Sequence, residues 1–267
     1  MANILDRIID DKREEVRQRQ SHTSMEQLRE RIAGLPRCRN FFKAVTKRNL
    51  RGINVIAEVK KASPSAGVIR PDFDPVAIAR IYEKSGADAI SVLTDEKYFQ
   101  GRLEYVEQVK QAVSLPVLRK DFIVDMWQVY ESRAAGADAI LLIGEALTAG
   151  NLMDLMIAAG ELGMTVLLEV HDVDCLLSVR SLIGFPKKGY SVLGINNRDL
   201  TTMQVDLRTT SRLMSLLDED PELVSESGIK TRDDVRKLKS IGVRAVLIGQ
   251  TLCEHPDIEK KFAELFG

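Results

Sequence analysis

The feature that most constrains the fold is a regular alternation of short apolar runs and amphipathic stretches from residue 53 onward. Most of the runs are continuously apolar, as is typical of parallel strands that are covered on both faces. Helical patterns such as Val76–Lys84 and Asp233–Lys239 lie between them. The eight predicted strands are Ile53–Val59, Ala89–Leu93, Pro116–Leu118, Ala139–Ile143, Thr165–Leu168, Ser191–Ile195, Glu222–Val224 and Ala245–Ile248.

This alternation predicts an α/β protein, specifically a (β/α)8 TIM barrel, because eight strand–helix units in series can close a parallel sheet on itself. The length of 267 residues suits that fold, which takes about 250 residues as one unit. A doubly wound open sheet is the alternative. Its dinucleotide-binding version is disfavoured because no Gly-x-Gly-x-x-Gly motif follows a strand.

Residues 1–50 differ from the rest and predict an N-terminal helical extension that packs on a barrel domain of residues 51–267. The mixed charges over residues 13–19 indicate a solvated helix face rather than a nucleic-acid-binding tail. Ser24 is the predicted cap of a second helix, and Phe41–Val45 predicts a third short helical segment. The apolar face of the first helix is made by Ile4, Leu5, Ile8 and Ile9.

Composition excludes several classes of partner. The net charge is −1, from 38 basic and 39 acidic residues, so no overall field attracts nucleic acid or a membrane surface. The N-terminus has no secretory-signal pattern, and no apolar run is long enough to span a membrane. We therefore expect a cytoplasmic protein without a nucleic-acid or membrane partner. A monomer is compatible with the sequence, which does not decide the oligomeric state.

Cysteines and histidines give no indication of a metal site. None of them has the spacing of metal ligands, and the odd number of cysteines is typical of reduced thiols in a cytosolic protein. We therefore expect no metal site built from cysteine or histidine. The residues concerned are Cys38, Cys175, Cys253, His22, His171 and His255.

Polar residues gather at the predicted strand ends, where the active site of such a barrel lies. Glu58 and Lys60 are two apart on one strand and therefore point the same way, into the barrel mouth. Three carboxylates and two ammonium groups at close quarters must pair or serve a ligand, and they shift each other's pKa as acid–base catalysis requires. The predicted catalytic residues are Glu58, Lys60, Lys120, Glu169, Asn196 and Glu226.

The other strand ends are less specific. Thr94–Phe99, Gly144–Ala146 and His171 also follow strands, but each taken singly is an ordinary polar loop. Ser227-Gly228 and Gly249-Gln250, after the seventh and eighth strands, favour a phosphate site built from backbone N–H groups and a helix N-terminus. A simple turn function for these glycines stays open. The segment Ser63-Pro64-Ser65 adds hydroxyl groups in a stiff turn after the first strand.

At these residues the sequence resembles the indole-3-glycerol phosphate synthase family of tryptophan biosynthesis. The resemblance implies a carboxy-lyase that closes the indole ring of 1-(2-carboxyphenylamino)-1-deoxyribulose 5-phosphate and loses CO2 and water. It implies a phosphorylated small-molecule substrate and no cofactor or metal. Seven ordered motifs carry it: Ile56–Ser65, Ser91–Phe99, Leu118–Phe122, Leu168–Val170, Gly194–Leu200, Ser225–Gly228 and Leu247–Gly249.

The resemblance also implies catalytic roles. Lys120 is similar to the general acid that protonates the substrate's ketone oxygen, and Glu169 to the base of the later dehydration. Lys60 would hold anionic groups, and the resemblance leaves both lysines in contention as the acid. Glu58 would orient the lysines and stabilise positive charge on the ring nitrogen. The residues that would bind the sugar hydroxyls and the lysine network are Asn196 and Glu226.

The implied substrate-binding residues form two groups. Those for the anthranilate part are Ser63 and Arg198 at its carboxylate and Phe99 against its ring, and those for the phosphate are Ser227, Gly228, Gly249 and Gln250. Two features depart from the family pattern. Residues 183–190 predict a surface insertion on the face opposite the active site, and Gln250 stands where a smaller or acidic residue is expected.

Three other functions are alternatives for such a barrel. Phosphoribosylanthranilate isomerase, a related barrel, calls for a Cys at the end of the first strand, where this chain has Glu58 and Lys60. A Schiff-base aldolase would use Lys60 or Lys120 as its nucleophile. A non-enzymatic barrel that senses a phosphorylated metabolite, or acts as a scaffold, is the third.

Overall fold

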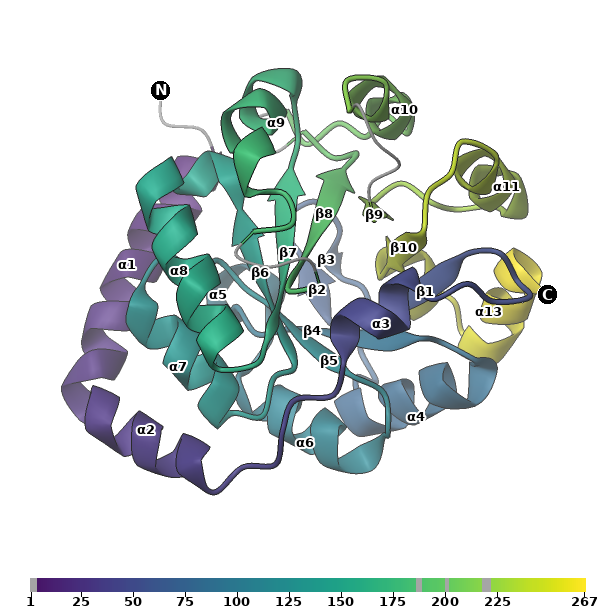
Figure 1. Ribbon diagram of the computed structural model, residues 1–267. Coiled ribbons are helices and arrows are strands. Elements are labelled where there is room, and N and C mark those ends of the chain that lie inside the picture. Colours follow the sequence, from purple (N-terminus) through teal and green to yellow (C-terminus); the bar gives the residue numbers. More distant parts are fainter. Residues whose placement is uncertain (1–3, 186–188, 200–201, 218–221) are drawn as a thin grey trace.

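A closed barrel of parallel strands forms the centre of the molecule (Figure 1). The computed structural model describes residues 4–185, 189–199, 202–217 and 222–267. Around the barrel the strands follow chain order, so each strand is connected to its next neighbour in the sheet. The predicted TIM barrel is confirmed and the open sheet is excluded. The barrel strands of the described residues are β1 (Asn54–Val59), β4 (Ala89–Leu93), β5 (Val117–Lys120), β6 (Ala139–Ile143), β7 (Thr165–Val170), β8 (Ser191–Asn196), β9 (Leu223–Glu226) and β10 (Ala245–Ile248).

Helices cover the outside of the barrel, and local sequence signals explain where they begin and end. For α4 (Pro75–Ser85), Asp74 caps the first turn, Pro75 takes the first helical position and Gly86 ends the helix with a left-handed φ of 92°. The other covering helices are α6 (Glu104–Ala112), α7 (Met126–Ala134), α8 (Ala149–Glu161), α9 (Val173–Val179), α10 (Arg208–Met214), α11 (Arg232–Ser240) and α13 (Ile258–Phe266). Short helical turns are α5 (Glu96–Phe99), η1 (Gly144–Ala146), η2 (Arg180–Leu182) and α12 (Gln250–Cys253).

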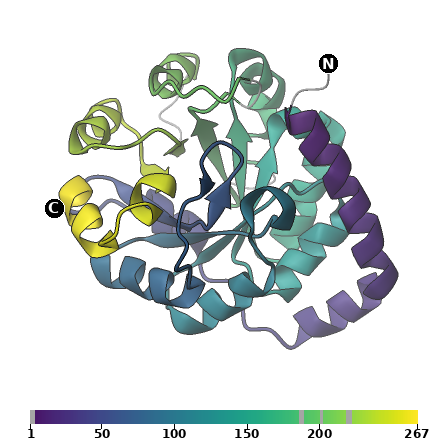
Figure 2. The ribbon, with the colours of Figure 1, turned by 180° about the vertical axis from the view of Figure 1, so that it is seen from behind.

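The N-terminal segment forms three helices, as predicted: α1 (Ile4–His22), α2 (Met25–Ala33) and α3 (Phe41–Thr46). Ser24 caps α2 in a capping box with Gln27. Helices α1 and α2 lie along one side of the barrel beside α7, as both views show (Figures 1 and 2). The domain boundary at residue 50 stays a prediction.

Helix α3 closes the N-terminal end of the barrel. The side-chain amide of Asn54, the first residue of β1, donates to the carbonyl oxygens of Val45 and Lys47 at 2.9 and 3.0 Å. Phe41 and Val45 are fully buried and pack with the apolar residues that fill the barrel interior. This end of the barrel is therefore closed, and among the described residues the cavity opens at the other end.

The inward-facing positions of the strands are apolar in the barrel interior and mostly polar at the mouth. Along each strand every second side chain points inward, so an apolar interior residue is followed two positions later by a residue at the mouth. Ile56 is thus followed by Glu58, and Leu118 by Lys120. The same step gives the pairs Leu167 and Glu169, Gly194 and Asn196, Val224 and Glu226, and Leu247 and Gly249.

Some predicted boundaries were wrong. Strands β5, β7, β8 and β9 extend one or two residues past the apolar runs, because the backbone ladder continues where the side chains become polar. A small hairpin, β2 (Ala62–Ser63) and β3 (Gly67–Val68), was not predicted. The predicted insertion at 183–190 leads into the N-terminal end of β8, and its residues 186–188 lie outside the described residues. None of the described helices has the length and apolarity of a membrane span.

Candidate active site

A cavity of about 770 Å³ opens at the C-terminal ends of the strands. Every residue predicted for the site lines it, together with apolar residues of α1 that were not predicted as part of the site. The predicted residues are Glu58, Lys60, Ser63, Phe99, Lys120, Glu169, Asn196, Arg198, Glu226, Ser227, Gly228, Gly249 and Gln250. The wall from α1 consists of Ile4, Leu5 and Ile8.

A lysine between two carboxylates occupies the floor of the cavity. The Nζ of Lys120, the last residue of β5, donates to Oε2 of Glu169 at 2.9 Å and lies 3.4 Å from Oε2 of Glu226. The side-chain amide of Asn196 donates to Oε1 of Glu169 at 3.2 Å. All four groups come from the last two residues of their strands, so the rigid barrel backbone fixes their relative positions.

Burial and pairing shift the pKa values of this cluster in different directions. Burial favours the neutral form of Lys120, but Glu169 and Glu226 outweigh it and raise the lysine pKa above its ordinary value. Burial would raise the pKa of Glu169, but Lys120 and then His171 hold it well below the ordinary value. Burial, together with the neighbouring Glu169, raises the pKa of Glu226. In this cluster the charged forms of Lys120 and Glu169 are favoured, whereas the neutral form of Glu226 is favoured.

The second lysine has its own partners. Lys60 Nζ lies 3.3 Å from Oε1 of Glu58 and 5.3 Å from the centre of the Phe99 ring, within cation–π range. The backbone at Glu58 is fixed from behind, because its carbonyl oxygen accepts hydrogen bonds from Tyr82 Oη at 3.0 Å and Cys253 Sγ at 3.3 Å. This side of the mouth therefore offers a cation and an aromatic face.

Arg198 and Ser63 border the mouth. The backbone N–H of Arg198 donates to Oδ1 of Asn196 at 3.0 Å, and its guanidinium donates to the carbonyl oxygen of Met203 at 3.1 Å. Partial burial lowers the pKa of Arg198, which still leaves it charged at neutral pH. Ser63 is buried, and its hydroxyl accepts from the N–H of Ala66 at 3.2 Å in the turn of the β2–β3 hairpin.

Backbone rather than side chains dominates the exits of β9 and β10. Ser227 and Gly228 both have left-handed φ values, 66° and 80°, and Gly249 precedes the first turn of α12. The side chain of Gln250 donates to Oε2 of Glu254 at 3.3 Å, one turn further along the chain, so it is turned along the helix. These exits lie across the barrel from β5 and β6 in the strand order.

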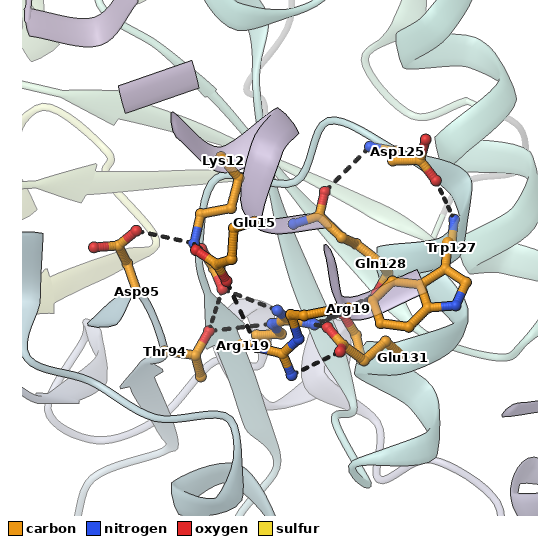
Figure 3. A network of polar contacts seen from close by, with 12 residues as sticks. Lys12, Glu15, Arg19, Thr94, Asp95, Arg119, Asp125, Trp127, Gln128 and Glu131 are labelled. Atoms are coloured by element: carbon orange, nitrogen blue, oxygen red, sulfur yellow. Dashed lines mark hydrogen bonds and ion pairs between the residues drawn. The ribbon is translucent and has the colours of Figure 1, made fainter. Parts of the chain in front are cut away.

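A buried ion network behind the mouth was not predicted (Figure 3). Lys12 of α1 lies 2.9 Å from Asp95 and 3.0 Å from Asp121, and all three side chains are almost fully buried. Arg119 also pairs with Asp121, at 2.9 Å. The network joins α1 to the ends of β4 and β5, next to Lys120. In the sequence Lys12 directly precedes the charged residues 13–19, which predict a solvated face, and its two aspartate partners are far along the chain.

His171 and Glu145 were also absent from the predicted site. His171 stands two positions beyond Glu169, and its ring lies between the carboxylates of Glu145 and Glu169. The only sequence signal for either residue is its place just after a strand, which many ordinary loop residues share.

Sequence comparison identifies the family of this barrel. The family profile described as indole-3-glycerol phosphate synthase matches residues 5–265. The chain belongs to the indole-3-glycerol phosphate synthase family. An indole-3-glycerol phosphate synthase of Neisseria meningitidis serogroup B is 47% identical over 267 residues, which is 100% of both chains. Another, of Geobacillus thermodenitrificans, is 53% identical over 226 residues, 85% of this chain and 86% of the relative.

Solved structures support the fold of this indole-3-glycerol phosphate synthase family member at much lower identity. The 3-hexulose-6-phosphate synthase of Salmonella typhimurium aligns with a TM-score of 0.63 at 14% identity, over 80% of this chain and 96% of that one. A chain of the tryptophan synthase a2b2 complex of Pyrococcus furiosus aligns with a TM-score of 0.57 at 13% identity, over 80% of this chain and 97% of that one. At these identities the likeness concerns the fold alone.

Proposed function

We propose that this chain converts 1-(2-carboxyphenylamino)-1-deoxyribulose 5-phosphate to indole-3-glycerol phosphate, CO2 and water in tryptophan biosynthesis. Family membership over residues 5–265 supports the activity. The observation that carries the mechanism is the Lys120–Glu169–Glu226 cluster on the floor of the cavity. Such a cluster supplies both a proton donor and a proton acceptor within hydrogen-bond distance of each other, which a ring closure followed by dehydration needs.

The proposed chemistry begins at Lys120. Its raised pKa keeps the ammonium protonated, so Nζ can donate a proton to the ketone oxygen as the ring carbon attacks the carbonyl carbon. The new carbon–carbon bond is followed by loss of the ring carboxylate as CO2. Glu169, held ionised by its low pKa, then accepts a proton from the CH2 carbon of the new ring. The hydroxyl on the neighbouring carbon leaves as water with a proton that the Lys60 ammonium donates. The raised pKa of Glu226 favours its neutral form, which suits a hydrogen bond to a sugar hydroxyl.

Substrate binding would use both sides of the mouth. Lys60, Arg198 and Ser63 offer cationic and hydroxyl groups to the anthranilate carboxylate, and Phe99 offers a ring face. The backbone N–H groups at the β9 and β10 exits would hold the phosphate, assisted by the left-handed turn at Gly228. Folding the flexible ribulose chain over the ring is an entropic task worth up to about 7–11 kcal/mol.

The alternatives fit less well. A Schiff-base lysine must be neutral to attack a carbonyl, whereas the pKa of Lys120 is raised. Phosphoribosylanthranilate isomerase calls for a cysteine at the end of the first strand, whereas the end of β1 carries Glu58 and Lys60. The absence of a cofactor requirement, the monomeric state and the cytoplasmic location stay predictions.

A fluorescence assay for indole-3-glycerol phosphate tests the proposal. We expect turnover by the wild type and losses of at least about 100-fold in Lys120→Ala and Glu169→Gln, the scale of acid–base catalysis. Lys84→Ala is the control, because Lys84 forms an exposed ion pair with Glu259 on the barrel exterior. An inactive wild type, or catalytic variants at full rate, contradicts the proposal. Borohydride trapping of a covalent adduct would favour the aldolase instead.

A further inference from the structure

A second polar chain leads from the catalytic cluster toward the outside of the barrel. His171 Nε2 lies 3.2 Å from Oε1 of Glu169, the oxygen that faces away from Lys120. On the other side of the ring, His171 Nδ1 lies 3.0 Å from Oε2 of Glu145. The Nε2 contact is an ion pair rather than a well-aligned hydrogen bond, so its effect is mainly electrostatic.

Glu145 holds both the ring and the backbone of His171. Its Oε1 accepts the backbone N–H of His171 at 2.7 Å, while Oε2 faces the ring. Turn η1, which carries Glu145, packs against α9 and the end of β7, since a Cβ at Gly144 would lie 2.5 Å from Cys175 Sγ and 3.4 Å from the carbonyl oxygen of Glu169. The pair is therefore part of the rigid barrel rim and not a loose surface contact.

The surroundings of the ring favour its charged form. Burial alone would lower the pKa of His171, but Glu145 and Glu169 outweigh it and raise the pKa to about 10. From α9, Asp172 and the Cys175 thiol approach the same region, and burial raises the pKa of Cys175 so that the thiol stays neutral. The other groups that face Glu169 are Lys120 from β5, Asn196 from β8 and Glu226 from β9.

A second cation beside Glu169 matters because Lys120, its closest partner, also has to serve the substrate. A substrate that draws Lys120 away removes the nearest positive charge from Glu169. His171 is then the cation that remains beside the carboxylate, on the oxygen that Lys120 does not touch. Such an arrangement would keep Glu169 ionised until it accepts the ring proton.

We propose that Glu145 and His171 are positioning residues that hold the Glu169 carboxylate in place and in its proton-accepting form. The proposal rests on the catalytic role proposed above for Glu169. His171 supplies the positive charge, and Glu145 fixes the ring and keeps that charge on it. Neither residue lines the cavity, so neither is expected to touch the substrate.

The first test is independent of activity. The chain has three histidines, His22, His171 and His255, so NMR titration of the imidazole signals is tractable, and the signal missing in His171→Asn assigns His171. We expect His171 to stay protonated up to about pH 9 in the wild type and to titrate at least one pH unit lower in Glu145→Gln. Titration of wild-type His171 near pH 6.5 would overturn the proposal.

The second test is the pH profile of kcat/KM for indole-3-glycerol phosphate formation. In His171→Asn the acid limb should move toward neutral pH by about one unit, because an opposite charge beside a carboxylate lowers its pKa by about that much or more. The variant should therefore lose more activity on the acid limb, at about pH 4–5, than at pH 8, while KM changes little. A loss of equal size at every pH would show a merely structural role and overturn the proposal.

Two controls separate the possible failures. Asp172→Asn removes a neighbouring exposed charge yet keeps a good cap for α9, so its profile should follow the wild type. If His171→Asn does not fold, as judged by circular dichroism, Glu145→Gln carries the test, and an unchanged His171 titration in it overturns the proposal. A wild type that never turns over the substrate overturns the proposed function instead, and the histidine titration still judges the Glu145–His171 pair.

Discussion

The position of the Glu58 carboxylate depends on the lack of a side chain at residue 249. A Cβ on Gly249 would lie 2.9 Å from Cδ of Glu58 and closer still to Oε1. We predict that Gly249→Ala displaces Glu58 and lowers kcat by about 100-fold, since a misplacement near 1 Å can cost that much. Steady-state kinetics with the fluorescence assay measures the loss.

Gly150→Ala is the matched control for that substitution. Gly150 lies in the first turns of α8, and a Cβ there meets nothing within 4 Å. It should keep full activity and gain up to about 1 kcal/mol of stability, because alanine favours the helix. Equal kinetics in the two variants would contradict the role given to Gly249.

Single residues show where the sequence was informative and where it was not. Glycine at position 249 was predicted to allow close approach of a phosphate, but it also makes room for Glu58. Gly194 does the same for Glu226, because a Cβ there would lie 2.5 Å from Oε1 of that carboxylate. Contacts between neighbouring strands decide these needs, and sequence order alone does not show which atoms meet across the barrel.

A buried lysine is among the contacts that fix helix α1 to the barrel. Lys12 is 1% exposed and contacts Asp95, Asp121 and Glu15. We predict that Lys12→Met lowers the free energy of unfolding by about 3–5 kcal/mol, because it leaves buried carboxylates without their cation. Activity should fall as well, since α1 forms one wall of the cavity. Urea unfolding followed by circular dichroism measures the loss of stability.

Arg13→Met on the same helix serves for comparison. Arg13 pairs with Asp10 at 3.1 Å, but these side chains are 56% and 75% exposed. Exposed pairs contribute at most about 1 kcal/mol, so the free energy of unfolding of this variant should be close to that of the wild type. If Lys12→Met lowered the free energy of unfolding as little as Arg13→Met, α1 would not depend on the buried network shown in Figure 3.

At the scale of elements, the apolar pattern predicted every barrel strand and the three N-terminal helices. It ended four strands too early, because a pattern of apolar residues stops where the side chains turn polar, although the backbone pairing continues to Lys120, Val170, Asn196 and Glu226. The site could be predicted because the strand ends of a barrel must converge. The buried charge of Lys12 could not, since its partners lie far along the chain.

The whole molecule separates an apolar interior from a ring of charges at one end, and this separation makes its stability depend on pH. Lys12 and Arg119 outweigh the burial of Asp121 and hold the pKa of that carboxyl below its ordinary value, and the pKa of Glu169 is lowered likewise. Such groups stabilise the fold fully above their unfolded pKa, near 4, and lose that contribution as pH falls toward the folded value. Glu226 has the opposite effect. Because its pKa is raised in the fold, its contribution to stability is more favourable at low pH than at high pH.

We therefore predict that stability declines steadily below about pH 4, and that Asp121 accounts for a measurable share of the decline. Asp121→Asn should be less stable than the wild type by about 3 kcal/mol at pH 7, with a gap that narrows as the pH falls below 4. Urea unfolding from pH 2 to pH 7 measures both curves. Asp206→Asn changes an exposed carboxylate whose pKa is also lowered, by Arg208, and should follow the wild type at every pH. If the difference in free energy of unfolding between the wild type and Asp121→Asn stays constant with pH, the Asp121 carboxylate does not stabilise the fold through its charge.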